Sequence, residues 1–337
     1  MHRLRIGVVG AGEIFQTRHV MYTDSPLLGT ETTWVCDRDP GVGQAVSGLI
    51  SPGCKAYTEL DSCPLDDVDA VVVTASGDHS AVIEHVLSGR NIPVFSEKPI
   101  STSLASVERL GLNLGDRRSQ IFVGYNRLCT PAFVALRNLI LADRGGSRSL
   151  TLRCILPDDL LYRDQYCVSR PGPEPSMSER LAPERWFEEV VLNLAIHEIG
   201  ILRAIDRHAA LKTATRLPAG CIATFESSVA GTVVLHLECL EGPGGGYVES
   251  IEFNSAEQRA TLSYPSVYLR DRGARLVVQR FSDAGESADL RVDRIDPLEA
   301  EWRSFLAFVS GSNAGDNSLD GALADMRMAT AIAERCA

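Results

Sequence analysis

The sequence has no long hydrophobic run and no paired cysteine or histidine motif. No apolar stretch approaches the roughly 18 residues of a membrane-spanning helix, and the apolar run at residues 6–9 is too short for the core of a signal peptide. The nine cysteines are scattered, odd in number and without a CxxC pair, and the seven histidines show no HExxH spacing. These absences predict a cytoplasmic protein with reduced thiols and with neither a disulfide framework nor a metal centre.

Positive charge is also scarce. The 33 Lys and Arg residues stand against 44 Asp and Glu residues, which gives a formal net charge of -11. This balance argues against nucleic acid or an anionic membrane as a partner. The 45% hydrophobic and 23% charged residues are ordinary for a globular enzyme, and 337 residues predict two domains. We therefore expect a small-molecule substrate.

A glycine turn follows the first predicted strand. Residues 4–9 are apolar and β-branched, as in a strand buried on both faces, and a helical segment follows the turn as far as residue 20. Gly10 and Gly12 let backbone amides at the helix start, those of Glu13 and Ile14, approach a dinucleotide pyrophosphate. Phe15 replaces the third glycine of the usual GxGxxG pattern. The helix is therefore expected to lie less close to the strand at this point.

The second predicted strand, residues 32–36, ends at an acidic residue. Asp37 is placed to accept hydrogen bonds from the adenosine ribose of NAD, although it could instead cap the turn at Asp39-Pro40. The neighbouring Arg38 could pair with the 2′-phosphate of NADP. We predict NAD or NADP as the cofactor, with NAD favoured.

Strands and helices then alternate. Strands are predicted at residues 70–74, 93–96 and 121–125, with helices from about residue 79 to 88 and after a cap at Ser101 or Ser103. This order is typical of an α/β fold with a doubly wound parallel sheet. Later strand ends, including the one at Thr74, would then surround the nicotinamide.

The run Pro93-Val94-Phe95-Ser96-Glu97-Lys98-Pro99 places an amine at such a strand end. Proline restricts the Lys98 backbone, so the side chain leaves the strand in a nearly fixed direction. A lysine desolvated there can donate or accept a proton. The alternative is a solvated Lys98 paired with Glu97.

The sequence resembles the Gfo/Idh/MocA family of NAD(P)-dependent oxidoreductases in five motifs: Gly10-Ala11-Gly12, Asp37, His79, Glu97-Lys98-Pro99 and Gly124-Tyr125-Asn126-Arg127. The resemblance implies a Rossmann domain over residues 1–126. Residues 127–337 would form an α+β domain with a large, mostly antiparallel open sheet, with the C-terminal helices packing back between the domains. It places Lys98 by the nicotinamide and the substrate hydroxyl, commonly before a cis peptide bond, with Glu97, Asn126 and Arg127 at the cofactor and Tyr125 at the substrate. His79 would lie near the cofactor, and capping of its helix is an equal interpretation.

The second half of the chain contains short segments in which apolar and polar residues alternate, as in strands. They are predicted at residues 148–156, 221–226, 231–239, 248–253, 259–263 and 275–280, and antiparallel pairing is favoured because no helix-sized insertions separate the later ones. A Pro-rich connection at residues 157–185 offers arginines, Arg163 among them, to an anionic substrate group. Internal pairing with nearby carboxylates is the favoured alternative. Two amphipathic helices, residues 298–309 and 322–336, carry the apolar stripe Trp302, Phe305, Leu306 and Phe308.

A predicted helix over residues 186–202 carries Asn193 and His197, four residues apart and therefore on one face. It resembles the Asp-x-x-x-His helix of the family, whose Asp and His face the nicotinamide. Asn193 replaces the aspartate, and an amide cannot raise the basicity of the histidine as a carboxylate would. The alternative is that His197 is a satisfied core histidine.

We predict hydride transfer between the nicotinamide and a carbinol or carbonyl carbon of a sugar, activated deoxysugar or cyclitol. Lys98 is the expected proton carrier, with His197 and Asn193 assisting; reduction of an imine or conjugated C=N bond is the alternative reaction. A protein that binds a dinucleotide or sugar as a sensor, without catalysis, is the alternative from another class. The open sheet predicts a homo-dimer or homo-tetramer.

Overall fold

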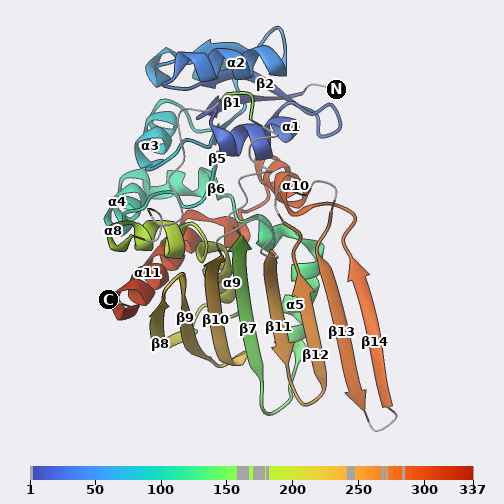
Figure 1. Ribbon diagram of the computed structural model, residues 1–337. Coiled ribbons are helices and arrows are strands. Elements are labelled where there is room, and N and C mark those ends of the chain that lie inside the picture. Colours follow the sequence, from blue (N-terminus) through green and yellow to red (C-terminus); the bar gives the residue numbers. More distant parts are fainter. Residues whose placement is uncertain are drawn as a thin grey trace. The chain divides into compact units, whose positions relative to one another are not determined.

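The computed structural model describes residues 3–157, 167–169, 179, 182–240, 247–266, 269, 272–282 and 285–336. The chain divides into two compact units, one built from residues 1–124, 160–174 and 302–323, the other from residues 125–159, 175–301 and 324–337. Each unit contains one sheet (Figure 1). The domain limits expected from the sequence, 1–126 and 127–337, stay a prediction.

The first unit contains a six-stranded parallel sheet in the order β3-β2-β1-β4-β5-β6. Its central strands are buried on both faces, which explains their uninterrupted apolar runs. The order reverses beside β1, where open sheets of this kind bind ligands. The strands are β1 (Leu4–Val9), β2 (Thr30–Cys36), β3 (Lys55–Tyr57), β4 (Ala70–Val73), β5 (Val94–Ser96) and β6 (Ile121–Val123).

Helices connect these strands, and their ends follow local sequence signals. The helix after the glycine turn begins at Glu13 and continues through a π-helical turn, Phe15–His19, into α1 (Val20–Thr23). Asp39 caps α2 (Pro40–Ile50), and Ser103 rather than Ser101 caps α4 (Leu104–Leu114). Between them lies α3 (Ser80–Gly89).

Residues 302–323 complete the core of this unit with aromatic side chains. The Trp302 ring stacks on Phe95 at 5.5 Å between ring centroids, and Phe305 packs edge-on against Phe95 at 5.3 Å. Phe308 contacts Phe122 of β6. Three residues of the predicted apolar stripe, Trp302, Phe305 and Phe308, are thus part of the core beside β5 and β6, whereas Leu306 is half-buried.

The second unit contains an eight-stranded sheet in the order β14-β13-β12-β11-β7-β10-β9-β8. All neighbours are antiparallel except β7 and β10, which are parallel because a long connection with helices and two other strands separates them. The strands are β7 (Ser149–Pro157), β8 (Ala210–Leu217), β9 (Gly220–Ser227), β10 (Gly231–Leu240), β11 (Val248–Asn254), β12 (Gln258–Ser263), β13 (Arg275–Ser282) and β14 (Gly285–Val292).

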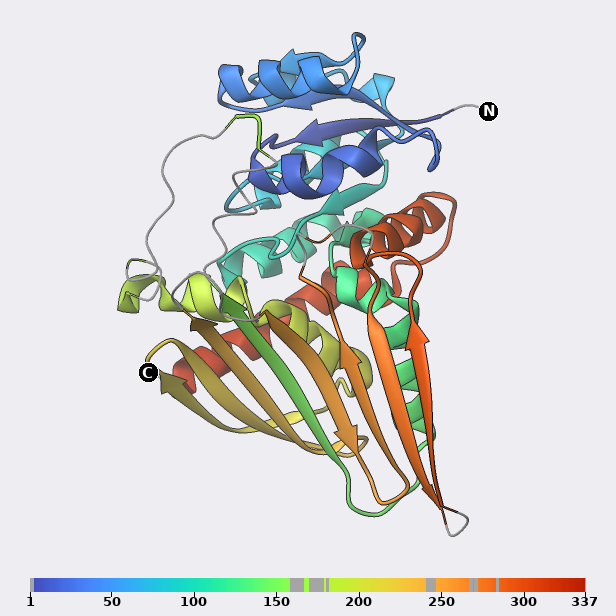
Figure 2. The same ribbon diagram turned by 45° about the vertical axis from the view of Figure 1, so that its right-hand side comes forward.

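One face of this sheet carries helices α5 (Pro131–Ala142) and α9 (Ile196–Ile205), as Figure 2 shows. Along β10 buried residues alternate with half-buried ones, as expected of a sheet that is covered on one side. The remaining helices are α8 (Pro183–Trp186), α10 (Pro297–Val309) and α11 (Leu319–Cys336).

The predicted helix over residues 186–202 is not one regular α-helix. A π-helical stretch, Phe187–Leu192, follows α8, and a turn precedes α9. The Asn193 amide donates to the carbonyl of Glu188, five residues back, so the turn is wider than in an α-helix. Asn193 and His197 therefore do not share the face of one continuous α-helix.

The expected fold class is confirmed: a doubly wound parallel sheet precedes a separate, mostly antiparallel sheet. None of the helices that the structure describes is both long and apolar enough to cross a membrane. All nine cysteines are free thiols.

Candidate active site

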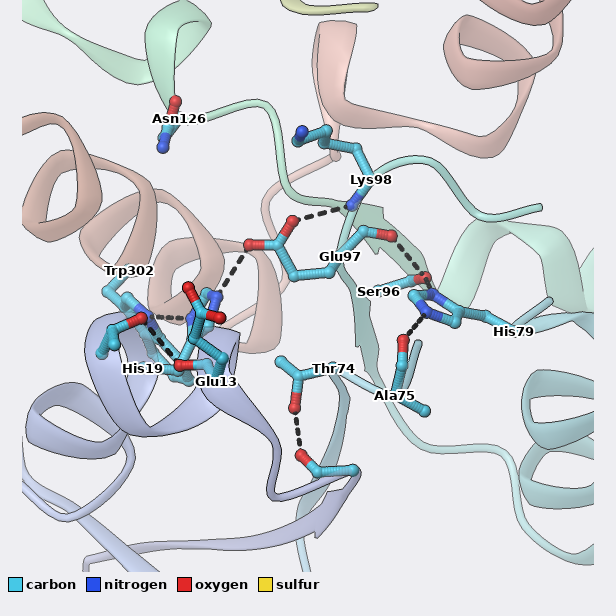
Figure 3. A network of polar contacts seen from close by, with 12 residues as sticks. Glu13, His19, Thr74, Ala75, His79, Ser96, Glu97, Lys98, Asn126 and Trp302 are labelled. Carbon is cyan, nitrogen blue, oxygen red and sulfur yellow. Dashed lines mark hydrogen bonds and ion pairs between the residues drawn. The ribbon is translucent and has the colours of Figure 1, made fainter. Parts of the chain in front are cut away.

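Gly10 ends β1 in a conformation that favours glycine. Its φ is +91°, and a Cβ built there would lie 2.3 Å from the backbone nitrogen of Ala75. The buried Thr74 hydroxyl donates to the Gly10 carbonyl oxygen at 2.5 Å (Figure 3). The turn is therefore held tightly against the end of β4.

Asp37 binds the same turn from β2. One oxygen of its half-buried carboxylate accepts a hydrogen bond from the Ala11 amide at 2.7 Å, and the other accepts one from the Asp39 amide at 2.9 Å. The exposed Arg38 donates to the Ser76 hydroxyl at 3.4 Å. The end of β2 and the glycine turn are thus joined where a ribose would lie.

Gln16, to which the sequence pointed in no way, joins this turn to a distant segment. Its side-chain amide nitrogen donates to the carbonyls of Ala11 at 2.8 Å and Ser169 at 2.9 Å. Its oxygen accepts from the amide of Val168 at 2.8 Å. Residues 167–169 of the Pro-rich connection are therefore bound to the first helix. Arg163 lies outside the described residues.

His79 is buried and braces two strand ends. Its Nε2 lies 2.5 Å from the carbonyl oxygen of Ala75, and its Nδ1 lies 2.9 Å from the Ser96 hydroxyl (Figure 3). Burial lowers the pKa of His79, against opposing contributions from these and nearby groups. The side chain makes no capping hydrogen bond to α3; the adjacent Asp78 carboxylate accepts from the Ser80 amide instead. The proximity of His79 to the cofactor stays a prediction.

Glu97 and Lys98 follow directly on β5, and the Lys98–Pro99 peptide bond is cis, as the family resemblance implies. One Glu97 carboxylate oxygen accepts from the backbone amide of Lys98 at 2.9 Å. The other lies 2.8 Å from His19 Nε2 (Figure 3). The Lys98 side chain is half-buried. Glu97 therefore holds the Lys98 backbone rather than only balancing its charge.

The charge of Glu97 is maintained by these contacts. Burial alone would raise its pKa, but the hydrogen bond and electrostatic interaction with His19, and then the charge and amide of Lys98, lower the pKa to about 2. Because this pKa lies below the ordinary value of 4.5, the ionised carboxylate stabilises the fold fully above about pH 4.5. This contribution disappears as the pH falls towards 2.

We therefore expect the wild-type protein to lose more unfolding free energy on acidification than Glu97→Gln. The difference should reach roughly 3 kcal/mol across this pH range, since each unit of pKa shift corresponds to about 1.4 kcal/mol. Urea denaturation of both proteins at a series of pH values measures it. Parallel pH dependence in the two proteins would contradict the assignment.

In the second unit, Arg127 is buried against Glu249. Its guanidinium donates to both carboxylate oxygens of Glu249, to Asn126 Oδ1 at 2.7 Å and to the Tyr247 hydroxyl at 3.0 Å. Burial opposes the charge, but Glu249 outweighs it and raises the pKa of Arg127. Roles for Asn126 and Arg127 in cofactor binding stay predictions.

Tyr125 supports His197 from behind. The Tyr125 ring is buried and meets the His197 ring edge-on, with 6.2 Å between centroids. Asp325, bound bidentately by Arg203, raises the pKa of Tyr125 together with the larger effect of burial. His197 itself is half-buried. Tyr125 therefore lies in the core rather than on an open surface.

Asn193 is exposed and donates to Glu189 Oε2 at 3.2 Å. The structure thus brings together Thr74, His79, Glu97 and Lys98 in the first unit, and Tyr125 and His197 in the second.

The residues of the glycine turn fit a dinucleotide. A Cβ built at Gly12 meets no atom of the described residues within 4 Å, so the backbone is open to an approaching group there. Glu13 and Ile14 begin the following helix, whose first amides lack intrahelical acceptors. A parallel sheet with this turn, and an acidic residue after the second strand, defines a dinucleotide-binding domain of the Rossmann class.

Comparison with known proteins supports this class. Residues 4–125 match the model of an oxidoreductase family with an NAD-binding Rossmann fold. These residues are thus similar to the Gfo/Idh/MocA family of oxidoreductases. The chain is 28% identical over 341 residues to an inositol 2-dehydrogenase from Salmonella paratyphi B, an alignment that covers 95% of this chain and 91% of that protein.

Solved structures share the whole fold. A 3-ketoreductase from Actinomadura kijaniata in complex with NADP has a TM-score of 0.73 at 16% identity. The superposition covers 99% of this chain and 98% of the ketoreductase chain. A UDP-N-acetylglucosamine 3-dehydrogenase from Acidithiobacillus ferrooxidans has a TM-score of 0.74 at 16% identity. That superposition covers 100% of this chain and 98% of the dehydrogenase chain.

Proposed function

We propose that this protein is an NAD(P)-dependent dehydrogenase or reductase that acts on a carbinol or carbonyl carbon of a cyclitol, sugar or activated deoxysugar. The observation that carries the proposal is the position of Lys98. This residue lies just after the end of β5, and its backbone amide donates to the Glu97 carboxylate. The polyhydroxylated substrate class is suggested by the names of the relative and of the two solved structures. A polyol offers the hydroxyl proton that an amine in this position can take up.

Gly10, Gly12 and the amides of Glu13 and Ile14 would hold the pyrophosphate of the cofactor. When bound, the nicotinamide supplies the site that accepts or donates a hydride. Each oxygen of the Asp37 carboxylate already accepts one backbone hydrogen bond and retains a further lone pair for a ribose hydroxyl. This acidic group favours NAD, whereas the exposed Arg38 is the feature that would admit NADP.

We expect Gly12→Ala to weaken NAD(P) binding at least about tenfold, or about 1.4 kcal/mol, with little change in stability. The added methyl group meets no described atom of the protein but occupies the approach of the pyrophosphate. The control is Gly48→Ala in α2, which also faces open space among the described residues. Titration of cofactor fluorescence with thermal unfolding checks both, and unchanged affinity in Gly12→Ala would contradict the placement.

In the oxidation direction we propose that Lys98 takes up the hydroxyl proton, and in reduction returns it. His197 assists by orienting the substrate, and the neutral Asn193 amide can donate or accept a hydrogen bond but takes no proton. Tyr125 supports His197 through the ring contact. Arg163 remains a proposed contact to an anionic substrate group. His79, Thr74, Glu97, Asn126 and Arg127 remain proposed cofactor-site residues.

A panel of cyclitols, sugars and nucleotide-activated sugars, assayed with NAD and NADP for nicotinamide oxidation or reduction, tests this function. Turnover with a polyol or its ketone is expected. The exposed Asn193 in place of an acid favours one second candidate, a sensor that binds the dinucleotide without catalysis. Stabilisation by NAD(P) without turnover of any panel member would favour the sensor.

We further propose that the face of the eight-stranded sheet opposite α5 and α9 joins a second copy of the chain, as a homo-dimer or homo-tetramer. Half-buried side chains such as those of Thr151 and Arg153 alternate along this face of β7. Sedimentation of the purified protein measures the oligomeric state.

A further inference from the structure

Three side chains, joined by hydrogen bonds and ending at the residue before Lys98, form what we term the Trp302–His19–Glu97 chain (Figure 3). The Trp302 indole nitrogen donates to His19 Nδ1 at 3.1 Å. His19 Nε2 lies 2.8 Å from Glu97 Oε1. Trp302 and His19 are both completely buried. The three residues come from the first helix, from the end of β5 and from α10.

The direction of these hydrogen bonds fixes where the His19 proton lies. An indole N–H can only donate, so Nδ1 must accept and carries no proton. The ring proton therefore lies on Nε2 and is donated to the Glu97 carboxylate.

Aromatic packing prevents the imidazole from leaving this position. The His19 ring meets Phe95 edge-on at 5.3 Å and Trp302 at 5.9 Å between centroids. Phe95 lies within β5, and its ring stacks on that of Trp302. The donor to Glu97 is thus rigid with respect to β5, the strand that Glu97 and Lys98 follow.

The other Glu97 oxygen transmits this rigidity to Lys98. It accepts from the Lys98 amide, so the carboxylate is held at one oxygen by His19 and at the other by the Lys98 backbone. Without the His19 donor, one oxygen of a partly buried carboxylate loses its partner, and the carboxylate can rotate away from the Lys98 amide. A misplacement of about 1 Å at a reacting group can cost about 100-fold in rate.

We propose that His19 is a positioning residue for Lys98: its Nε2–H holds the Glu97 carboxylate so that the second oxygen fixes the Lys98 backbone. This inference rests on the proposed function, in which Lys98 carries the proton. In this proposal His19 acts on Lys98 through Glu97.

Two variants distinguish the loss of the Nε2–H donor from the loss of the imidazole ring. His19→Gln can place an amide N–H where Nε2 lies, whereas His19→Asn is too short to reach Glu97 and places its amide near Nδ1. We expect kcat to fall about 10- to 100-fold in His19→Asn and about threefold or less in His19→Gln. The cofactor Kd and the substrate KM should stay within about twofold of the wild-type values in both variants.

A double-mutant cycle with Lys98→Ala gives the readout that a structural role would not produce. If His19 acts only through Lys98, His19→Asn has no further effect on the residual rate of Lys98→Ala. An equal loss in both backgrounds, or equal kcat in His19→Gln and His19→Asn, would overturn the proposal. If His19→Asn does not fold, Glu97→Gln is used in the same cycle, with the same non-additivity expected.

Different results contradict the proposed function and the positioning role of His19. A wild-type protein without turnover, or a Lys98→Ala variant at the wild-type rate, contradicts the proposed function. A wild-type rate in His19→Asn beside an impaired Lys98→Ala contradicts the positioning role alone.

Discussion

Replacing Lys98 with alanine is expected to lower kcat by about two to four orders of magnitude, the usual contribution of a general acid or base. The cofactor Kd should stay nearly unchanged, because the proposed pyrophosphate and ribose contacts come from the glycine turn and Asp37. Steady-state turnover and cofactor titration measure the two quantities separately. A loss confined to kcat and kcat/KM indicates an interaction made in the transition state.

The matched control is Lys55→Ala. Lys55 is an exposed lysine in β3 of the same unit, so its removal changes the net charge equally without touching the proposed site. Its kcat should be that of the wild type. A Lys98→Ala variant that turns over as fast as Lys55→Ala would refute Lys98 as the proton carrier.

The largest effect on stability is expected from Glu249→Leu. The Arg127 and Glu249 side chains are each only 4% exposed, so removing the carboxylate leaves a buried guanidinium without its counter-charge. Breaking such a pair from one side costs about 3 to 5 kcal/mol. Urea denaturation followed by tryptophan fluorescence measures the loss in the unit that contains α5 and α9.

The control is the double variant Arg127→Met with Glu249→Leu. Removing both charges takes away the desolvation cost along with the attraction, so the double variant should be more stable than Glu249→Leu alone. A Glu249→Leu variant within about 1 kcal/mol of the wild type would show that water or another group compensates Arg127.

Much of the fold could be predicted because buried strands leave uninterrupted apolar runs in the sequence. β1 and β4 are largely β-branched runs whose central residues are buried on both faces, and Gly10 after β1 is required by the turn. The strands β3, β8 and β14 were missed for the opposite reason. They are sheet-edge strands, and β14 is exposed along its whole length, so it has no apolar alternation.

Only part of the candidate site could be predicted from the sequence. Lys98 was marked by the proline after it, but the residue that orders Glu97 lies 78 positions away, and Trp302 lies 283 positions from His19. No role was predicted for His19, although one signal could have found it: His19 is four residues after Phe15, and residues at that spacing lie on the same face of a helix. The π-helical turns at Phe15–His19 and Phe187–Leu192 depend on tertiary packing, which a periodicity of apolar residues does not reveal.

The most direct test of the account is the single-turnover rate of nicotinamide reduction by wild type, Lys98→Ala and His197→Ala. It is measured at saturating cofactor and substrate from about pH 6 to about pH 10. The account predicts a rate that is slow at every pH in Lys98→Ala, and a wild-type pH dependence in His197→Ala. A wild-type rate in Lys98→Ala, or an apparent pKa near about 6.5 that is lost in His197→Ala, would contradict it.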